Sequence, residues 1–534
     1  MNLLVLLAGL RPWSSAPLSI FARAFAAIAL LSLEMQAVTW WRVGTLRTLV
    51  FLNTALALGT LWLWRPAREP ESTASRPSRF PWTAVLLLGS LVLVLNLGRP
   101  METADPYHLQ RAMQIERLGT LEYDIEADPK VNVLGWAYEL VLADLGQVPV
   151  AGPVLVRLHG VLGLVFYALA VAAVRQWLPG GPTWMWGVLF SVPVLFHQFV
   201  LIKNDLFGAV PAFVALCWFV VRARKASCAE IAWAGSLVGF SVAMKLTSFP
   251  LAVVAAGVVL VERRERWRPF ACLLLGGALG SVAGGLPFML VQNARWYGDA
   301  LRPLADLGNR HTNVADALVG VGRFATSLFD FGLLTPSWWP DRGGWGTTFG
   351  APLIWALASL VAHWRTAPEA RRALVVAGAS FLLFASVYPD ADIAHRLTLA
   401  AGLLPIAVAV HLVGQDGARA SWLRAALVAV LVISSAQIAR SAALYWLRST
   451  PENRVACPFN WDDLPRGHSL AAVRSVRMQT CLTRTWSASV VARSRKIISV
   501  GRIVSSSIRC ARPPRWSRPA ASWPGRPGSP IPNC

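Results

Sequence analysis

Two carboxylates follow the third apolar run of the chain, Glu102 and Asp105, and Tyr107 and His108 come directly after them. Asp105 precedes Pro106, and a residue before proline is disfavoured in helical geometry, whereas proline suits the first position of a helix. We therefore predict a helix that begins at Pro106 and is capped by Asp105. A carboxylate held at the positive end of a helix, just beyond a membrane span, suits a general base that takes a proton from an acceptor hydroxyl or amine. A plain helix cap without chemistry is the alternative.

The charge of this stretch differs from that of the rest of the chain. Residues 99–130 hold seven acids and four bases, although the whole chain carries a net charge of +22. Asp124 and Asp128 offer oxygen ligands for a divalent metal, but their short spacing is more typical of a solvated loop. We therefore assign no metal ligands and no certain cofactor. The use of a divalent metal is kept as an alternative.

A second group of charged side chains lies at the ends of later apolar runs. It comprises Lys203, Asp205, Lys245, Arg295, His395 and Arg396. Charged groups near membrane depth are costly and are usually kept for binding or chemistry. The alternatives are structural: the lysines can snorkel from helix ends, and His108 can be a satisfied core residue. Asp205 can pair with Lys203 or Lys245, or it can cap the helix that follows it.

The composition indicates the frame that holds these residues. The chain has 534 residues, of which 55% are hydrophobic and 15% charged, and its mean hydropathy is +0.49. Soluble domains carry about 25% charged residues, so we predict an all-α polytopic membrane protein with about 12 or 13 spans. The apolar runs lie at 18–38, 45–64, 82–97, 153–174, 183–202, 206–221, 229–247, 249–261, 269–291, 351–363, 373–388, 397–414 and 421–446.

Basic loops predict the orientation of these spans. Five clusters of Lys and Arg fall on one side, which the positive-inside rule makes cytoplasmic, provided that 133–144 is a surface or re-entrant helix. Both groups of candidate residues then lie on the outer face. Three regions follow: N-terminal spans with a cytoplasmic loop (1–80), a membrane module (81–450) and a basic tail (451–534). The module carries external loops at 98–150, 292–350 and 388–396.

The tail has its own composition. No acid follows Asp463, whereas 13 Lys or Arg do. Such a segment cannot build a core, so we expect a disordered basic tail or a frame-shifted replacement of the normal C-terminus.

Four segments of the chain share a pattern of polar residues with a known family. The first segment runs from Asp105 through Tyr107, His108 and Arg111 to Leu118-Gly119. The others are Lys203-Asn204-Asp205, Gly239 to Lys245-Leu246-Thr247, and Asn293 to Gly298 and Pro303. In this order they resemble bacterial membrane glycosyltransferases of the GT-C superfamily, the protein O-mannosyltransferase-like and aminoarabinose-transferase-like groups, and the resemblance covers about residues 80–415.

The resemblance implies a GT-C-like fold and an inverting sugar transfer from a polyprenyl-phosphate donor on the outer face of a bacterial inner membrane. The acceptor is a lipid, a glycan or a protein, and nucleic acid is not a partner. A first-loop acid acts as the base. The family acid often lies about four residues before the tyrosine, where this chain has Thr103, so Asp105 and Glu102 both qualify and Asp105 is favoured.

The resemblance also implies how the donor is held. Basic side chains neutralise the lipid phosphate, with Lys203, Lys245, Arg396 and Arg295 as candidates and His395 beside them. Tyr107, His108, Arg111 and Asp205 complete the substrate-binding set. The alternative from another class is a lipid or glycan transporter, which would keep polar groups near mid-membrane on broken helices. A membrane scaffold without chemistry is the third possible function.

Overall fold

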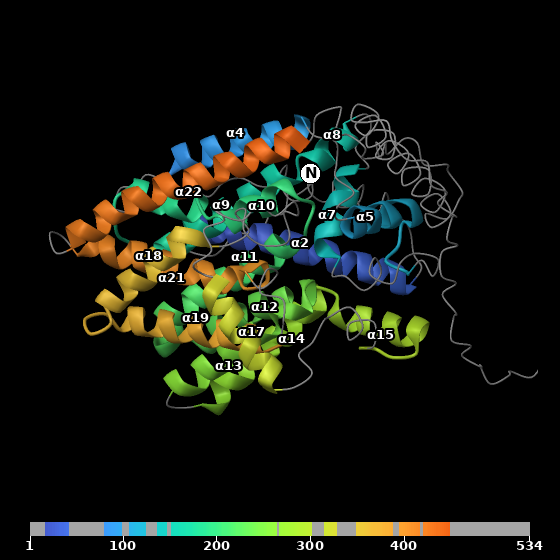
Figure 1. Ribbon diagram of the computed structural model, residues 1–534. Coiled ribbons are helices and arrows are strands. Elements are labelled where there is room, and N and C mark those ends of the chain that lie inside the picture. Colours follow the sequence, from blue (N-terminus) through green and yellow to red (C-terminus); the bar gives the residue numbers. More distant parts are fainter. Residues whose placement is uncertain are drawn as a thin grey trace, which may run out of the picture. The chain divides into compact units, whose positions relative to one another are not determined.

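The computed structural model describes residues 16–41, 80–98, 106–123, 136–146, 151–263, 266–301, 314–327, 349–387, 395–416 and 420–448. All of them belong to one compact unit, Met1–Cys481. Within these ranges 87% of the residues are helical and no strand occurs (Figure 1). Glu102 and Asp105, the predicted loop residues Asp124 and Asp128, and the basic tail lie outside the described residues.

The described helices follow the apolar runs of the sequence. In chain order they are α2 (Ala16–Trp41), α4 (Trp82–Gly98), α5 (Pro106–Leu118), α7 (Ala137–Gly146), α8 (Gly152–Arg157), α9 (His159–Trp177), η1 (Thr183–Phe190), α10 (Pro193–Val200), α11 (Asp205–Arg222), η2 (Ala223–Lys225), α12 (Cys228–Met244), η3 (Leu246–Ser248), α13 (Phe249–Glu262), α14 (Trp267–Ala283), α15 (Leu286–Tyr297), α17 (Val314–Ser327), α18 (Gly350–Ala362), α19 (Pro368–Val387), α21 (Leu399–Gln415) and α22 (Ser421–Arg448).

Several of these helices suit a membrane. Among the described residues, segments of α2, α9, α11, α19 and α22 are long and apolar enough to cross one, and two bent pairs raise the number to seven at most. Five shorter apolar helices accompany them: α4, α12, α13 with η3, α18 and α21. The fold is therefore that of an all-α, multi-pass membrane protein. The predicted 12 or 13 spans require the shorter helices to cross as well, together with the run at 45–64, which lies outside the described residues.

Three apolar runs expected to be single helices are broken. The run at 153–174 divides at Leu158 into α8 and α9. The run at 183–202 bends by 61° between η1 and α10, where Pro193 lacks the N–H that would continue the helix. The run at 269–291 bends by 58° between α14 and α15 at Gly285, whose φ of +86° favours glycine. The ring of Trp136 occupies the space in which a side chain at Gly285 would lie.

Small residues bring α12 and α14 into backbone contact. A Cβ atom built on Gly239 would overlap the carbonyl of Gly277, and one built on Gly276 would overlap the carbonyl of Ala232. Side chains therefore cannot separate the two helices here, and membrane helices commonly pack closely in this way. On its other side α12 packs against α11, whose apolar segment is 89% buried.

Basic residues gather where α11 ends. The Arg263 guanidinium donates to the carbonyl of Arg224 (2.8 Å), and Arg372 donates to the carbonyl of Val220 (2.9 Å). Arg372 also pairs with Glu262 at 2.9 Å. Three of the five basic clusters thus share one end of the bundle, as the topology prediction requires, and Asp205 begins α11 at the opposite end.

Candidate active site

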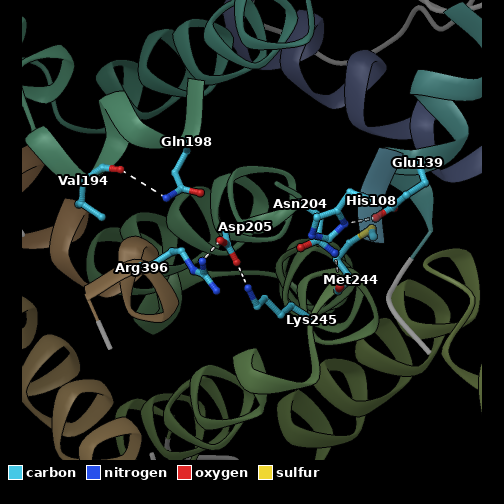
Figure 2. Close-up of polar contacts among 9 residues, drawn as sticks. All are labelled: His108, Glu139, Val194, Gln198, Asn204, Asp205, Met244, Lys245 and Arg396. Carbon is cyan, nitrogen blue, oxygen red and sulfur yellow. Dashed lines mark hydrogen bonds and ion pairs between the residues drawn. The ribbon is translucent and has the colours of Figure 1, made fainter. Parts of the chain in front are cut away.

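The centre of the candidate site is the carboxylate of Asp205, whose side chain is only 2% exposed. One carboxylate oxygen lies 2.9 Å from Nε of Arg396, and the other pairs with Nζ of Lys245. Figure 2 shows the carboxylate between the two cations. Of the two expected partners of Asp205, Lys203 and Lys245, the structure pairs it with Lys245. The alternative, in which Asp205 caps the following helix, does not hold, because Asn204 is the N-cap residue and Asp205 is the first helical residue.

Three chain segments meet at this cluster because their ends are tied together. The side-chain amide of Asn204 donates to the carbonyl of Met244 (3.2 Å), which joins the start of α11 to the end of α12. Lys245 follows Met244 in an extended conformation (φ −154°, ψ 106°) and ends α12. Arg396 lies just before α21, which packs against α11. The cluster therefore joins the ends of three neighbouring helices.

The cluster carries an excess of positive charge. Asp205, Lys245 and Arg396 have a formal charge of +1 together, and the two cations keep 21% and 24% of their side chains exposed. Lys203 lies two residues before Asp205 and is buried. A fixed, partly exposed cation beside a low-dielectric interior stabilises an anion well. The arrangement suits a ligand that carries a phosphate or a carboxylate.

A second buried polar pair joins the first-loop helix to α7. Helix α5 begins at Pro106, as predicted, and the His108 ring on it is hydrogen-bonded to the Glu139 carboxylate of α7. Glu139 is fully buried. Helix α7 has ten residues and is too short to cross a membrane, which agrees with the surface or re-entrant helix predicted there.

Aromatic rings connect this pair to the start of α11. The Tyr138 ring lies 6.2 Å from the His108 ring and 4.9 Å from the Phe207 ring. Phe207 is two residues beyond Asp205 in α11. The helix that follows the predicted base is therefore linked through Tyr138 to the helix that carries the ion cluster.

Arg111 has an internal structural role. Its guanidinium is fully buried and donates to the carbonyls of Leu121 (2.8 Å) and Glu122 (3.3 Å) and to the side chain of Gln114. It also lies over the Tyr123 ring, 5.6 Å from its centroid. These contacts hold the chain after α5, and the substrate-binding role of Arg111 stays a prediction.

The Asn293-to-Gly298 segment is likewise occupied internally. The Tyr123 hydroxyl donates to the Asn293 side chain (2.8 Å), and the Asn293 amide donates to the carbonyl of Ala300 (3.0 Å). Burial raises the pKa of Tyr123, so its hydroxyl stays protonated at neutral pH. Arg295 is exposed and lies over the ring of its neighbour Trp296.

His395 is not a cation at neutral pH. Its ring is packed between Phe324 and Phe349, with centroids at 5.1 and 5.5 Å, and its Nε2 is hydrogen-bonded to the Ser327 hydroxyl (2.7 Å). Burial lowers the pKa of His395 to about 4. It therefore adds no charge for a phosphate. The side chain of Tyr107 lies outside the described part of the chain.

Sequence reasoning missed several polar groups near the cluster. Glu139 and Gln198 were not predicted as site residues. Gln198 is buried on α10, and its amide donates to the carbonyl of Val194 at 3.5 Å (Figure 2). His197 is hydrogen-bonded to the Tyr445 hydroxyl of α22. An adjacent His-Gln pair inside an apolar run was the signal that could have revealed them.

No protein-family model matches the chain, and a search of curated proteins finds no match. Within the described ranges no group of three His, Cys, Asp or Glu side chains is placed to hold a metal ion.

Proposed function

We propose that the chain is a membrane glycosyltransferase that moves a sugar from a polyprenyl-phosphate donor to an acceptor. The observation that carries the proposal is the Asp205–Lys245–Arg396 cluster, which has a net positive charge and is linked through Phe207 and Tyr138 to the first-loop helix. A transferase of this class needs a cationic site for the leaving phosphate near an acid that accepts a proton.

Each group has a role in the proposed reaction. Asp105, with Glu102 as the alternative, takes the proton from the acceptor hydroxyl or amine. The acceptor atom bonds to the anomeric carbon while the bond from that carbon to the phosphate oxygen breaks, which inverts the configuration. Lys245 and Arg396 stabilise the negative charge that develops on the departing polyprenyl phosphate. Asp205 orients both cations.

The proposed setting is a bacterial inner membrane with the ion cluster on the outer face. The support is charge: the basic groups around Arg224, Arg263 and Arg372 lie at the other end of the bundle, and such clusters favour the cytoplasmic side. The acceptor is then a lipid, a glycan or a protein outside the cytoplasm.

The test is transfer of radiolabelled sugar from a panel of polyprenyl-phosphate sugars by the purified protein in lipid. Asp105→Asn should lower the rate by about 10²–10⁴-fold, the usual effect of removing a general base. Glu102→Gln is the matched control, and the reverse pattern would move the base to Glu102. Unchanged transfer in both variants, or no transfer from any donor, would contradict the proposal.

A lipid or glycan transporter is the second candidate, and the bent helices favour it. The η1–α10 pair bends by 61° and carries the buried His197 and Gln198, and transporters commonly bind substrate at such breaks. Flipping of a fluorescent polyprenyl-phosphate sugar in vesicles separates the two functions. A transporter would flip this lipid equally well with Asp105→Asn and would transfer no sugar.

A further inference from the structure

Two cysteines lie next to each other across the α12–α14 contact. Cys228 is the first residue of α12, and Cys272 lies in the second turn of α14. Their side chains lie within interaction distance of one another. Both are free and partly exposed, whereas Cys217, the other free cysteine in the described part of the chain, is buried.

The register of the two helices explains why these cysteines meet. The backbone of Ala232 touches Gly276, that of Ser236 touches Gly280, and that of Phe240 approaches Gly284. Each of these contacts joins residues that are 44 positions apart, and each follows the previous one by a single helical turn, so α12 and α14 run parallel. Cys228 and Cys272 are the next pair in the same series, one turn before Ala232 and Gly276.

This register gives the geometry that a disulfide needs. A disulfide requires Cα atoms about 4.4–6.8 Å apart and side chains that face each other. One turn away, a Cβ atom built on Gly276 would lie only 2.7 Å from the Cα atom of Ala232, so the helix axes are very close. Cys228 and Cys272 continue this series of contacts, and their side chains lie within interaction distance of each other.

We propose that Cys228 and Cys272 form a reversible thiol switch that glutathione disulfide, or another low-molecular-weight disulfide, converts into a bond between α12 and α14. The sulfur of one cysteine attacks the glutathione disulfide and releases one glutathione thiol. The second cysteine then attacks the mixed disulfide and releases the other. Two protein thiols are oxidised, one glutathione disulfide is reduced, and the two thiol protons end on the two glutathione molecules.

The surroundings suit this anionic oxidant. Arg224 and Lys225 precede Cys228, and Arg266 and Arg268 precede Cys272, so basic side chains flank both thiols. The bond would close at the end of α12 that lies opposite Lys245, and it would fix the helix that carries this cation.

The test uses the full chain in detergent, exposed to glutathione disulfide, then denatured, alkylated and digested with trypsin. The expected product is peptide 226–245 joined to peptide 267–295, lighter by two hydrogen atoms than the two reduced peptides together. Cys217 should be alkylated fully. The joined peptide should disappear with Cys272→Ser, which should instead leave glutathione on Cys228, and dithiothreitol should reverse it.

Two outcomes would overturn the proposal. One is full alkylation of Cys228 and Cys272 after the oxidant treatment. The other is separate glutathione adducts, or bonds to other cysteines, in place of the joined peptide. Since the unmodified chain supplies the main readout, the result does not depend on the folding of a variant.

Discussion

Replacement of Asp205 by Asn should destabilise the fold, because it removes the only negative charge from the ion cluster. Removing one partner of a buried ion pair costs about 3–5 kcal/mol, mostly because the remaining charge is left uncompensated. Lys245 and Arg396 keep about a fifth to a quarter of their side chains exposed and can recover some hydration. We therefore expect the low end of the range, about 3 kcal/mol. At about 2 °C per kcal/mol for a large unit, Tm should fall by roughly 6 °C.

The assay is thermal unfolding of the detergent-solubilised protein, followed by tryptophan fluorescence. Glu262→Gln is the control, because Glu262 forms a single pair with Arg372, also at 2.9 Å, at the other end of the bundle, and its side chain is 23% exposed. Such a pair contributes at most about 1 kcal/mol. Adding Arg396→Gln to Asp205→Asn should recover part of the loss, because it removes an unpaired cation. A shift for Asp205→Asn no larger than that for Glu262→Gln would refute the reasoning.

Three further substitutions, two of them with a control variant, test other parts of the structure by the same unfolding measurement. Gly239→Leu should cost about 3 kcal/mol or more, because its side chain overlaps the α14 backbone, whereas Gly257→Ala has open space and should be neutral or stabilising by about 0.5–1 kcal/mol. His108→Ala should cost about 3 kcal/mol and more than Glu139→Gln, because only the first leaves a buried carboxylate without its partner; equal losses would contradict this. His395 has a pKa of about 4 in the folded chain and 6.5 when unfolded, so the unfolded chain binds more protons between these values and stability falls as the pH drops from 7 to 4. His395→Gln should remove about 3 kcal/mol of that fall, and an unchanged pH dependence would contradict the burial argument.

Hydropathy predicted most of the helices, because a long apolar run has few other stable forms in a membrane. The run at 206–221 became α11, and that at 421–446 became α22, with bounds only a few residues different. The breaks were harder to predict. Pro193 and Gly285 are visible in the sequence, but proline and glycine also occur within continuous membrane helices. The space that the Trp136 ring takes beside Gly285 depends on packing between segments far apart in the chain.

The candidate site was predictable only where its partners are close in sequence or chemically distinctive. Lys245 was one of the two expected partners of Asp205, because Lys245 and Asp205 each lie at the end of an apolar run on the same predicted face of the membrane. Arg396 was expected near the phosphate but not as a partner of Asp205, since sequence distance carries no information on that pairing. His395 looked like a charged residue, yet two aromatic rings that enclose it come from distant segments and keep it neutral.

The ion cluster also imposes an order on biosynthesis. About 190 residues separate Asp205 from Arg396, which at ~5–20 residues per second corresponds to about 10–40 s of translation. For most of that interval Asp205 has only Lys245 as a cationic partner, and the two charges cancel. The cluster acquires its net positive charge only when Arg396 has been made. A nascent chain that stalls before Arg396 therefore holds a neutral Asp205–Lys245 pair and lacks the excess charge that the proposed phosphate site needs.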